Sequence, residues 1–363
     1  MAKRVSVDKT LFTVTLLLVF IGLVMVFSAS AVVAKERFGS PYTFVIRQLA
    51  WAVAGVGAMF VLMKIDYRRY KHPAIVFSLF GITTLLLIAV FFLDRSHNTH
   101  RWIKMGPFSF QPSELAKPTL ILFLAWFLET RTKSMDDWRR TLLPAVLPAM
   151  ALAGLIVLQP DLGTGIACVA ITATILFVAG MRLRYFAYAL APMPILFYLL
   201  IVRVSWRYQR VLAFLDPYAD PQGRGFHIIQ SLIAVGTGGL AGMGLMEGKQ
   251  KLFYLPEPHT DFIFAVIAEE FGLLGSLTVV FLFAVFLYRG IRAAALTRDV
   301  FARYLATGFV AMVVVQALIN ISVVLGLMPT KGIPLPFVSS GGSSLFVMLA
   351  SVGVLLNITQ QTD

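Results

Sequence analysis

Long apolar runs without any charged residue dominate this sequence. Residues 11–30, for example, contain no Asp, Glu, Lys or Arg. A run of about 20 apolar residues can cross the hydrocarbon core of a bilayer as a helix, because its backbone polar groups are then all bonded within the segment. Charged residues make up 13% of the chain, against roughly 25% in soluble domains. A water-soluble globular protein is therefore excluded.

The apolar segments predict an all-α polytopic integral membrane protein with ten transmembrane helices. We expect residues 1–363 to form a single membrane domain. The first segment, whose apolar stretch runs from Leu11 to Phe27, is too long for a typical signal-peptide core and is interpreted as a retained anchor. The predicted spans are residues 11–30, 45–63, 74–93, 115–129, 142–158, 164–180, 186–203, 262–288, 304–327 and 343–358.

The basic residues flank these spans and indicate their orientation. The chain has 31 Lys plus Arg against 18 Asp plus Glu, a net charge of +13, but no basic stripe interleaved with aromatic residues. Nucleic acid is therefore not an expected partner, whereas membrane lipid is. With the N-terminus inside, the cytoplasmic segments hold 17 Lys and Arg and the outer segments 14. This bias predicts that both termini are cytoplasmic.

A large outer loop, residues 204–261, separates the seventh and eighth spans. Its residues 225–245 are also free of charge, but they include six glycines. If this segment crossed the membrane, the following loop, which holds four arginines between residues 289 and 303, would face outward against the positive-inside bias. We therefore expect a re-entrant or interfacial segment on the outer side.

Polar motifs gather on the outer side, and the first is the run from Gln111 to Lys117. Glu114 and Lys117 are spaced i, i+3, so they share one face of a helix and can neutralise each other. Two interpretations stay open. The residues form a structural ion pair at the head of the fourth span, or they line a polar cavity in which Lys117 is available to a phosphate.

Two further outer residues also have a structural and a functional interpretation. Asp161, in the tight turn from Gln159 to Thr164, either caps the following helix or faces the same cavity. Arg47, at the outer end of the second span, either snorkels to the membrane surface or binds a ligand.

The richest motif is the run from Tyr254 to Ala265. Two prolines keep the first part of the run extended. His259, Thr260 and Asp261 follow it directly, where an apolar helix begins. Asp261 is either the N-cap of that helix or a general base, because desolvation beside apolar residues raises a carboxyl pKa. His259 on its own is ambiguous.

The last motif runs from Pro329 to Ser344. It contains Lys331, and its small residues, including Ser343, open the tenth span with N–H groups and hydroxyls that suit an anion. Gly341 and Gly342 serve close helix packing equally well. The single cysteine, Cys168, excludes disulfides and cysteine metal clusters.

In these motifs the chain resembles the SEDS family of cell-wall polymerases, whose members are FtsW, RodA and SpoVE. The segments from Tyr254 to Glu257 and from Pro329 to Gly332 look more like FtsW than RodA. Ser340 departs from the tyrosine that usually precedes the two glycines. The matching motifs are Phe27–Ser30, Gln111–Lys117, Gln159–Thr164, Asp216–Pro221 with Gly225 and Gln230–Ser231, Tyr254–Ala265 and Gly341–Ser344.

The resemblance implies a peptidoglycan glycosyltransferase of the bacterial cytoplasmic membrane. Such an enzyme polymerises lipid II into glycan strands on the outer face during cell division, with a class B penicillin-binding protein and other divisome proteins as partners. The family's His-Thr-Asp carboxylate falls on Asp261. Glu114, Lys117 and Asp161 match residues that the family places around one central cavity.

Glycan extension needs a base and cations for a departing pyrophosphate. We assign Asp261 as the base, Lys117 and Arg47 as phosphate partners, and Arg210 and Lys331 as weaker ones, with His259 and Ser343 in the same cavity. A single displacement would invert the sugar and release undecaprenyl pyrophosphate. No metal-ligand spacing is recognisable, so a divalent cation such as Mg²⁺ or Mn²⁺ stays open. A lipid II flippase and a non-catalytic scaffold for the transpeptidase are the alternatives.

Overall fold

The computed structural model describes residues 7–94, 100–106, 108–131, 137–252 and 254–361. Three of the basic residues that the orientation argument counts as cytoplasmic, Lys3, Arg4 and Lys133, lie outside these ranges, as does Arg95 of the outer set.

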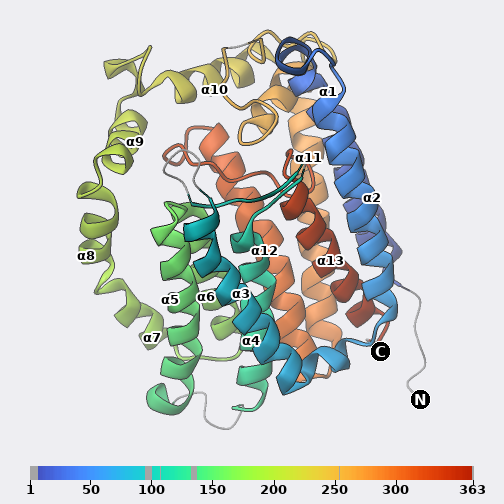
Figure 1. The fold of residues 1–363 in the computed structure, drawn as a ribbon, viewed down its shortest axis with the longest axis vertical. Helices are drawn as coiled ribbons and strands as arrows, with labels where there is room; N and C mark the ends of the chain where they lie inside the picture. The colour runs from blue at the N-terminus through green and yellow to red at the C-terminus, as the bar shows by residue number, and fades with distance from the viewer. Residues whose placement is uncertain (1–6, 95–99, 107, 132–136, 253, 362–363) are drawn as a thin grey trace.

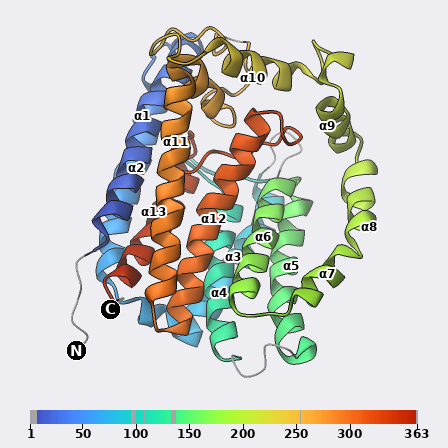
Figure 2. The same ribbon diagram turned by 180° about the vertical axis from the view of Figure 1, so that it is seen from behind.

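The described chain is mostly helical, as predicted (Figures 1 and 2). A two-stranded antiparallel hairpin, β1 (Ile103–Met105) with β2 (Phe108–Phe110), was not expected and pairs Lys104 with Ser109. Short 3₁₀ turns cover Tyr67–Lys71 and Pro217–Ala219, and π-helical turns cover Trp138–Leu142 and Tyr198–Val202. The α-helices are α1 (Lys9–Phe38), α2 (Thr43–Lys64), α3 (Pro73–Leu93), α4 (Pro112–Glu129), α5 (Leu143–Leu158), α6 (Leu162–Val178), α7 (Leu183–Leu190), α8 (Met193–Phe197), α9 (Ser205–Leu215), α10 (Phe226–Thr237), α11 (Ile263–Leu296), α12 (Val300–Val324) and α13 (Gly342–Thr359).

The helices confirm a polytopic membrane fold but not the count of ten spans. Among the described residues, seven helices are long and apolar enough to cross a membrane, and α7 with α8 and the turn after it would make an eighth. Helix α6, with 17 residues, is shorter than these, and α4 carries Glu114 and Lys117 in its first two turns. Ten crossings therefore remain a prediction.

The seventh predicted span is broken. Its two parts meet at 45° around Pro192 and Pro194, which lack the N–H that a continuous helix would use. Helices α7 and α8, which are described in full, bury none of their residues. Figures 1 and 2 show α7, α8 and α9 as a column at the edge of the molecule.

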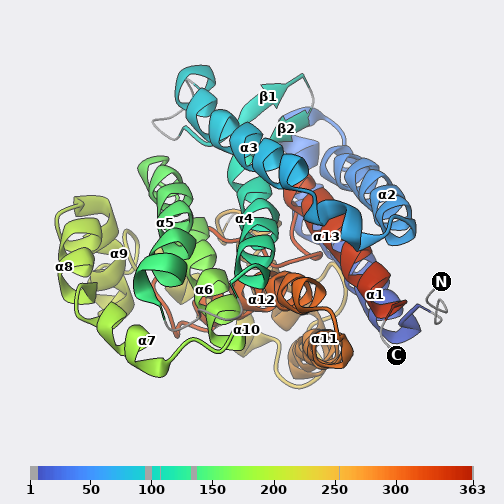
Figure 3. The ribbon, with the colours of Figure 1, turned by 90° about the horizontal axis from the view of Figure 1, so that it is seen from below.

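Small residues let α2 and α13 pack closely. A Cβ added at Gly55 of α2 would lie 2.7 Å from the Leu349 side chain of α13, and one at Gly353 of α13 would lie 2.6 Å from the Met59 carbonyl oxygen. Such contacts are typical of helix pairs in membranes, where van der Waals packing drives association. Seen from below, α4 and α12 lie in the middle of the helices (Figure 3).

The segments predicted to be cytoplasmic meet at one end of the molecule. The Asp8 carboxylate caps α1 and pairs with the Arg289 guanidinium at 2.6 Å, and the Asp8 N–H donates to Thr359 Oγ1 at 3.3 Å. Tyr67 donates its hydroxyl to Asp299 at 3.0 Å. Of the four arginines predicted to share one loop, Arg289 and Arg292 lie in the last turns of α11, Arg298 in the turn after it and Arg303 in α12. This region therefore lies at the same end as the start of α1 and the end of α13.

The glycine-rich segment 225–245 lies at the opposite end (Figure 1). Its helix α10 has 12 residues, which makes it about 18 Å long, against a hydrocarbon core of about 30 Å. The loop after α10 contacts α11 where Gly272 breaks the helix with φ 63° and ψ −156°. Leu273 N–H donates to Gly239 O at 2.9 Å and Met243 N–H to Glu269 O at 3.0 Å. These bonds satisfy the backbone groups that the break frees.

Gln222→Cys and Lys249→Cys, each in a Cys168→Ala background, should both react with a membrane-impermeant thiol reagent added from outside. The reason is that the segment between them is predicted to return to the outer side, and both positions are exposed whereas Cys168 is buried. Labelling is measured by mass spectrometry on intact cells or spheroplasts. If Lys249→Cys reacts only after the membrane is opened, the segment crosses and the ten-span topology is wrong.

Candidate functional site

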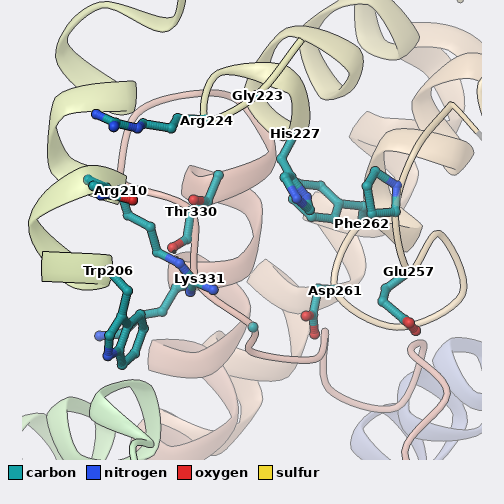
Figure 4. Close-up of a pocket in the computed structure, with 13 residues that line it drawn as sticks. Trp206, Arg210, Gly223, Arg224, His227, Glu257, Asp261, Phe262, Thr330 and Lys331 are labelled. Atoms are coloured by element: carbon teal, nitrogen blue, oxygen red, sulfur yellow. Dashed lines mark hydrogen bonds between the residues drawn. The ribbon is translucent and has the colours of Figure 1, made fainter. Parts of the chain in front are cut away.

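A cavity of about 420 Å³ lies between α9, α10 and two loops. Figure 4 shows its lining side chains, which come from four separate stretches of the chain. These are α9, the turn that leads into α10, the segment before α11 and the segment after α12. The lining residues are Trp206, Gln209, Arg210, Gly223, Arg224, His227, Pro256, Glu257, Asp261, Phe262, Thr330, Lys331 and Gly332.

Asp261 lines this cavity just before α11. Helix α11 begins at Ile263 and has Phe262 as its N-cap, without a side-chain cap, so the N-cap interpretation of Asp261 is wrong. Burial raises the pKa of the Asp261 carboxyl to about 7, and the nearby carboxylates of Glu257 and Asp161 add to the rise. Arg210 and Arg101 oppose it. At neutral pH this carboxyl is poised to accept a proton.

The segment after α12 approaches the Asp261 carboxylate closely. A Cβ added at Gly332 would lie 2.7 Å from Asp261 Oδ2, so only glycine permits this approach without a shift. The backbone carbonyl of Asp261 accepts a hydrogen bond from Asn320 Nδ2 of α12 at 2.8 Å. Residues more than 50 positions away in sequence therefore contact both the backbone carbonyl and the carboxylate of Asp261.

The loops that contain the last two motifs form one unit. Ser339 donates its hydroxyl to Thr260 O at 2.6 Å, and Ser340 N–H donates to His259 O at 2.9 Å. Gln48 of α2 donates to Ser339 O at 3.1 Å. The sequence presented these loops as separate motifs, whereas the structure joins them beside the cavity.

Cations face the carboxylates across the cavity. Figure 4 shows Arg210 and Lys331 on one side and Asp261 and Glu257 on the other. Burial lowers the pKa of the Lys331 ammonium to about 8, with Asp161 opposing this shift. Arg210 donates to Thr330 O at 3.4 Å, and its guanidinium lies 5.1 Å from the centre of the Trp206 ring. The cavity thus offers a base on one wall and anion-binding groups on the other.

Glu114 and Lys117 form the ion pair that their spacing suggested. Lys117 Nζ donates to Glu114 Oε2 at 2.8 Å and to Gln316 Oε1 at 2.7 Å. The two residues are 3% and 1% exposed and do not line the cavity. Lys117 is therefore engaged within the protein rather than open to a phosphate.

Asp161 caps α6, which is one of the two roles that the sequence left open for it. Its Oδ1 accepts from Thr164 N–H at 3.1 Å, and its Oδ2 accepts from Gln111 Nε2 at 3.2 Å. Gln111 N–H in turn donates to Ser343 Oγ at 3.3 Å. Asp161 and Ser343 thus hold the start of α4 and do not line the cavity, although the charge of Asp161 influences Asp261 and Lys331.

Arg47 and His259 also lie outside the cavity lining. Arg47 is exposed on α2, and its guanidinium lies 6.0 Å from the centre of the Phe38 ring, which fits snorkelling. His259 is buried against the Phe44 ring at 4.5 Å, and burial lowers its pKa. Its Nδ1 finds no hydrogen-bond partner among the described residues.

Sequence reasoning did not select several cavity residues. Trp206, Gln209, Arg224 and His227 lie in the long outer loop, and the clustering of aromatic and basic residues from Trp206 to Arg210 was the available signal. Among the described residues, no three His, Cys, Asp or Glu side chains come together as a metal site.

The helical bundle and its charged cavity define a multi-span membrane protein with an enzyme-like site at one end. The chain belongs to the FtsW/RodA/SpoVE family, whose sequence profile, described as "Cell cycle protein", matches residues 8–363. The membership that the motifs indicated is confirmed.

Relatives match along nearly the whole chain. Stage V sporulation protein E of Bacillus subtilis (strain 168) is 44% identical over 359 residues, 99% of this chain and 98% of that protein. The "Probable peptidoglycan glycosyltransferase FtsW" of Geobacter metallireducens is 40% identical over 354 residues, 97% of this chain and 94% of that one.

Solved structures share the fold. A chain from work on "Structural coordination of polymerization and crosslinking by a peptidoglycan synthase complex" superposes with a TM-score of 0.80 at 30% identity, covering 98% of each chain. The rod shape determining protein RodA of Thermus thermophilus superposes with a TM-score of 0.71 at 27% identity, also over 98% of each chain.

Proposed function

We propose that this chain is a peptidoglycan glycosyltransferase that polymerises lipid II into glycan strands. The names of its FtsW relatives support this activity. The observation that carries it is the placement of Asp261, whose pKa is about 7, opposite Lys331 and Arg210 in one cavity. These are the two kinds of group that glycosyl transfer from a lipid pyrophosphate requires.

Asp261 acts as the general base. Its carboxylate takes the proton of the acceptor sugar hydroxyl as that oxygen bonds to the anomeric carbon of the donor. The bond from that carbon to the pyrophosphate oxygen breaks, and the electron pair leaves with undecaprenyl pyrophosphate. Lys331 and Arg210 neutralise the charge that develops on the pyrophosphate. A single displacement of this kind inverts the configuration at the anomeric carbon.

Four of the other predicted site residues have a structural role near the cavity. Glu114 with Lys117, and Asp161 with Ser343, hold the start of α4 beside the loops that carry Asp261 and Lys331. Arg47, exposed on α2, is proposed to contact lipid head groups.

The proposed setting is the outer face of the bacterial cytoplasmic membrane, with both termini cytoplasmic. The charge bias of the loops supports this orientation. A class B penicillin-binding protein is the proposed partner, because the similar chain comes from a complex that couples polymerisation to crosslinking. The FtsW names among the relatives favour a role in division with other divisome proteins.

Polymerisation of labelled lipid II by the purified protein, with and without its transpeptidase, tests the function. We expect glycan strands with a transpeptidase whose own active site is blocked. Transfer of lipid II across vesicle membranes without polymer would instead favour a flippase. Polymer that depends on the partner alone would favour a scaffold.

The pH dependence of kcat/KM should be bell-shaped, with a maximum between about 7 and about 8. Activity rises through pH 7 because the Asp261 carboxyl must lose its proton to act as a base. It falls above pH 8 because Lys331 loses the charge that binds pyrophosphate. Lys331→Arg should remove the fall at high pH, since an arginine stays protonated. An unchanged alkaline limb in that variant would exclude Lys331 from this role.

A further inference from the structure

Helix α12 carries two buried amide side chains one turn apart that both face the segment after it. Gln316 Nε2 donates to Pro334 O at 2.9 Å, and Asn320 Nδ2 donates to Ile333 O at 2.7 Å. The two side chains therefore hold consecutive carbonyls of the segment that contains Lys331 and Gly332. Gln316 is 2% exposed and Asn320 is 1% exposed.

Each amide also binds a second partner in another part of the molecule. Asn320 Nδ2 donates to the Asp261 backbone carbonyl at 2.8 Å. Gln316 Oε1 accepts from Lys117 Nζ at 2.7 Å, and Lys117 is held by Glu114. The two amides thus connect the buried ion pair on α4, the carbonyls of Ile333 and Pro334, and the backbone carbonyl of Asp261.

We propose that Gln316 and Asn320 are positioning residues that fix the separation of Asp261 and Lys331. They clamp the segment 332–334 between the ion pair of α4 and the backbone of Asp261. This inference rests on the proposed function, since it assigns Asp261 and Lys331 to opposite walls of one reaction site.

The chemistry of the clamped segment explains why it needs side-chain donors. Pro334 and Pro336 have no N–H, so the segment cannot form a regular backbone ladder, and its buried carbonyls need donors from elsewhere. Asn320 Oδ1 has no hydrogen-bond partner among the described residues, so this amide serves as a donor only. Because Gly332 lies against the Asp261 carboxylate, any movement of the segment opens space there for water.

Asn357 of α13 is a matched control for an amide with a purely structural role. It is 3% exposed, its Nδ2 donates to Met63 O at 2.9 Å, and its Oδ1 accepts from Tyr67 N–H at 2.9 Å. It thus bonds two backbone groups, as Asn320 does, but at the opposite end of the molecule from the cavity.

Asn320→Leu and Asn357→Leu should therefore differ in steady-state kinetics of lipid II polymerisation. For Asn320→Leu we expect kcat to fall by about tenfold to a hundredfold, with KM little changed. The acid limb of its pH profile should move to lower pH, because more water then surrounds the Asp261 carboxylate. The other charges that face Asp261, from Glu257, Arg210, Asp161 and Arg101, are the same in both variants. Asn357→Leu should leave the pH profile unchanged.

Hydrogen exchange of residues 329–341 gives a readout that does not depend on activity. Exchange in this segment should be faster in Asn320→Leu, and also in Gln316→Met, which serves if Asn320→Leu does not fold. Equal pH profiles and equal exchange in Asn320→Leu and Asn357→Leu would overturn the positioning role. Absence of polymerisation by the wild-type protein would instead sink the proposed function, and the exchange data would still decide whether the amides hold the segment.

Discussion

Asp261→Asn is expected to abolish glycan synthesis while the protein still accumulates in the membrane. Asparagine has nearly the same size but no basicity, so the loss should be about 10²-fold to 10⁴-fold. The change should not harm folding, because Asp261 caps no helix in this structure. Both activity, as polymer from labelled lipid II, and protein amount in membranes are measured.

The raised pKa of Asp261 sharpens this prediction. The folded protein holds this proton up to about pH 7, whereas the unfolded chain releases it near 3.8. Stability therefore falls as pH rises between these values, and the ionised carboxylate above pH 7 is a cost to folding. Asp261→Asn removes that cost, so its thermal stability at pH 8 should equal or exceed that of the wild type.

Glu247→Gln is the control, because Glu247 is an exposed carboxylate of the same outer loop that does not line the cavity. It should polymerise lipid II normally. Near-normal polymerisation by Asp261→Asn as well would exclude Asp261 as the base.

Glu114→Gln or Lys117→Met alone should strongly reduce the stability of the protein or its activity. The effects of the two substitutions should not be additive. Each single change leaves a buried charge without its partner, which costs about 3–5 kcal/mol. The double variant removes both charges, so its loss should be smaller than the sum of the two single losses. Thermal unfolding of the detergent-solubilised protein and lipid II polymerisation provide the two readouts of a double-mutant cycle.

Lys71 and Glu129 offer a matched pair for comparison. Their side chains meet at 2.5 Å, closer than the 2.8 Å of the buried pair, but they are 46% and 18% exposed. The same cycle on this pair should show a coupling below about 1 kcal/mol, since water screens it. Strict additivity for Glu114 and Lys117 would show that they do not act as one unit.

The positions of the membrane helices were predictable because their signal is local. The span predicted at 74–93 is observed as Pro73–Leu93, and that at 343–358 as Gly342–Thr359. Every residue that crosses the hydrocarbon core must have its backbone polar groups bonded within the helix, and most side chains there must be apolar. The length and apolar character of a segment therefore suffice to locate a membrane helix. The break at Gly272 in α11 escaped this reasoning, because it depends on a distant loop that supplies its hydrogen bonds.

The set of residues that line the cavity could not be predicted in the same way. Its lining comes from stretches near residues 206–210, 223–227, 256–262 and 330–332, and nothing local says that these meet. Asp261 was selected because a carboxylate at the edge of an apolar helix is conspicuous. Trp206 and His227 were not, because each is ordinary for an interfacial loop.

By itself the sequence determined the membrane class, the family and the identity of the acidic and basic residues that carry the proposed chemistry. The tertiary structure alone showed which contacts the ionisable residues of these motifs make. Asp161 caps a helix and Asp261 does not, and Lys117 bonds to Gln316 rather than facing the cavity. The reason is that an ionisable side chain takes its role from the partners within hydrogen-bond distance and from its access to water. Both depend on packing between segments far apart in the chain.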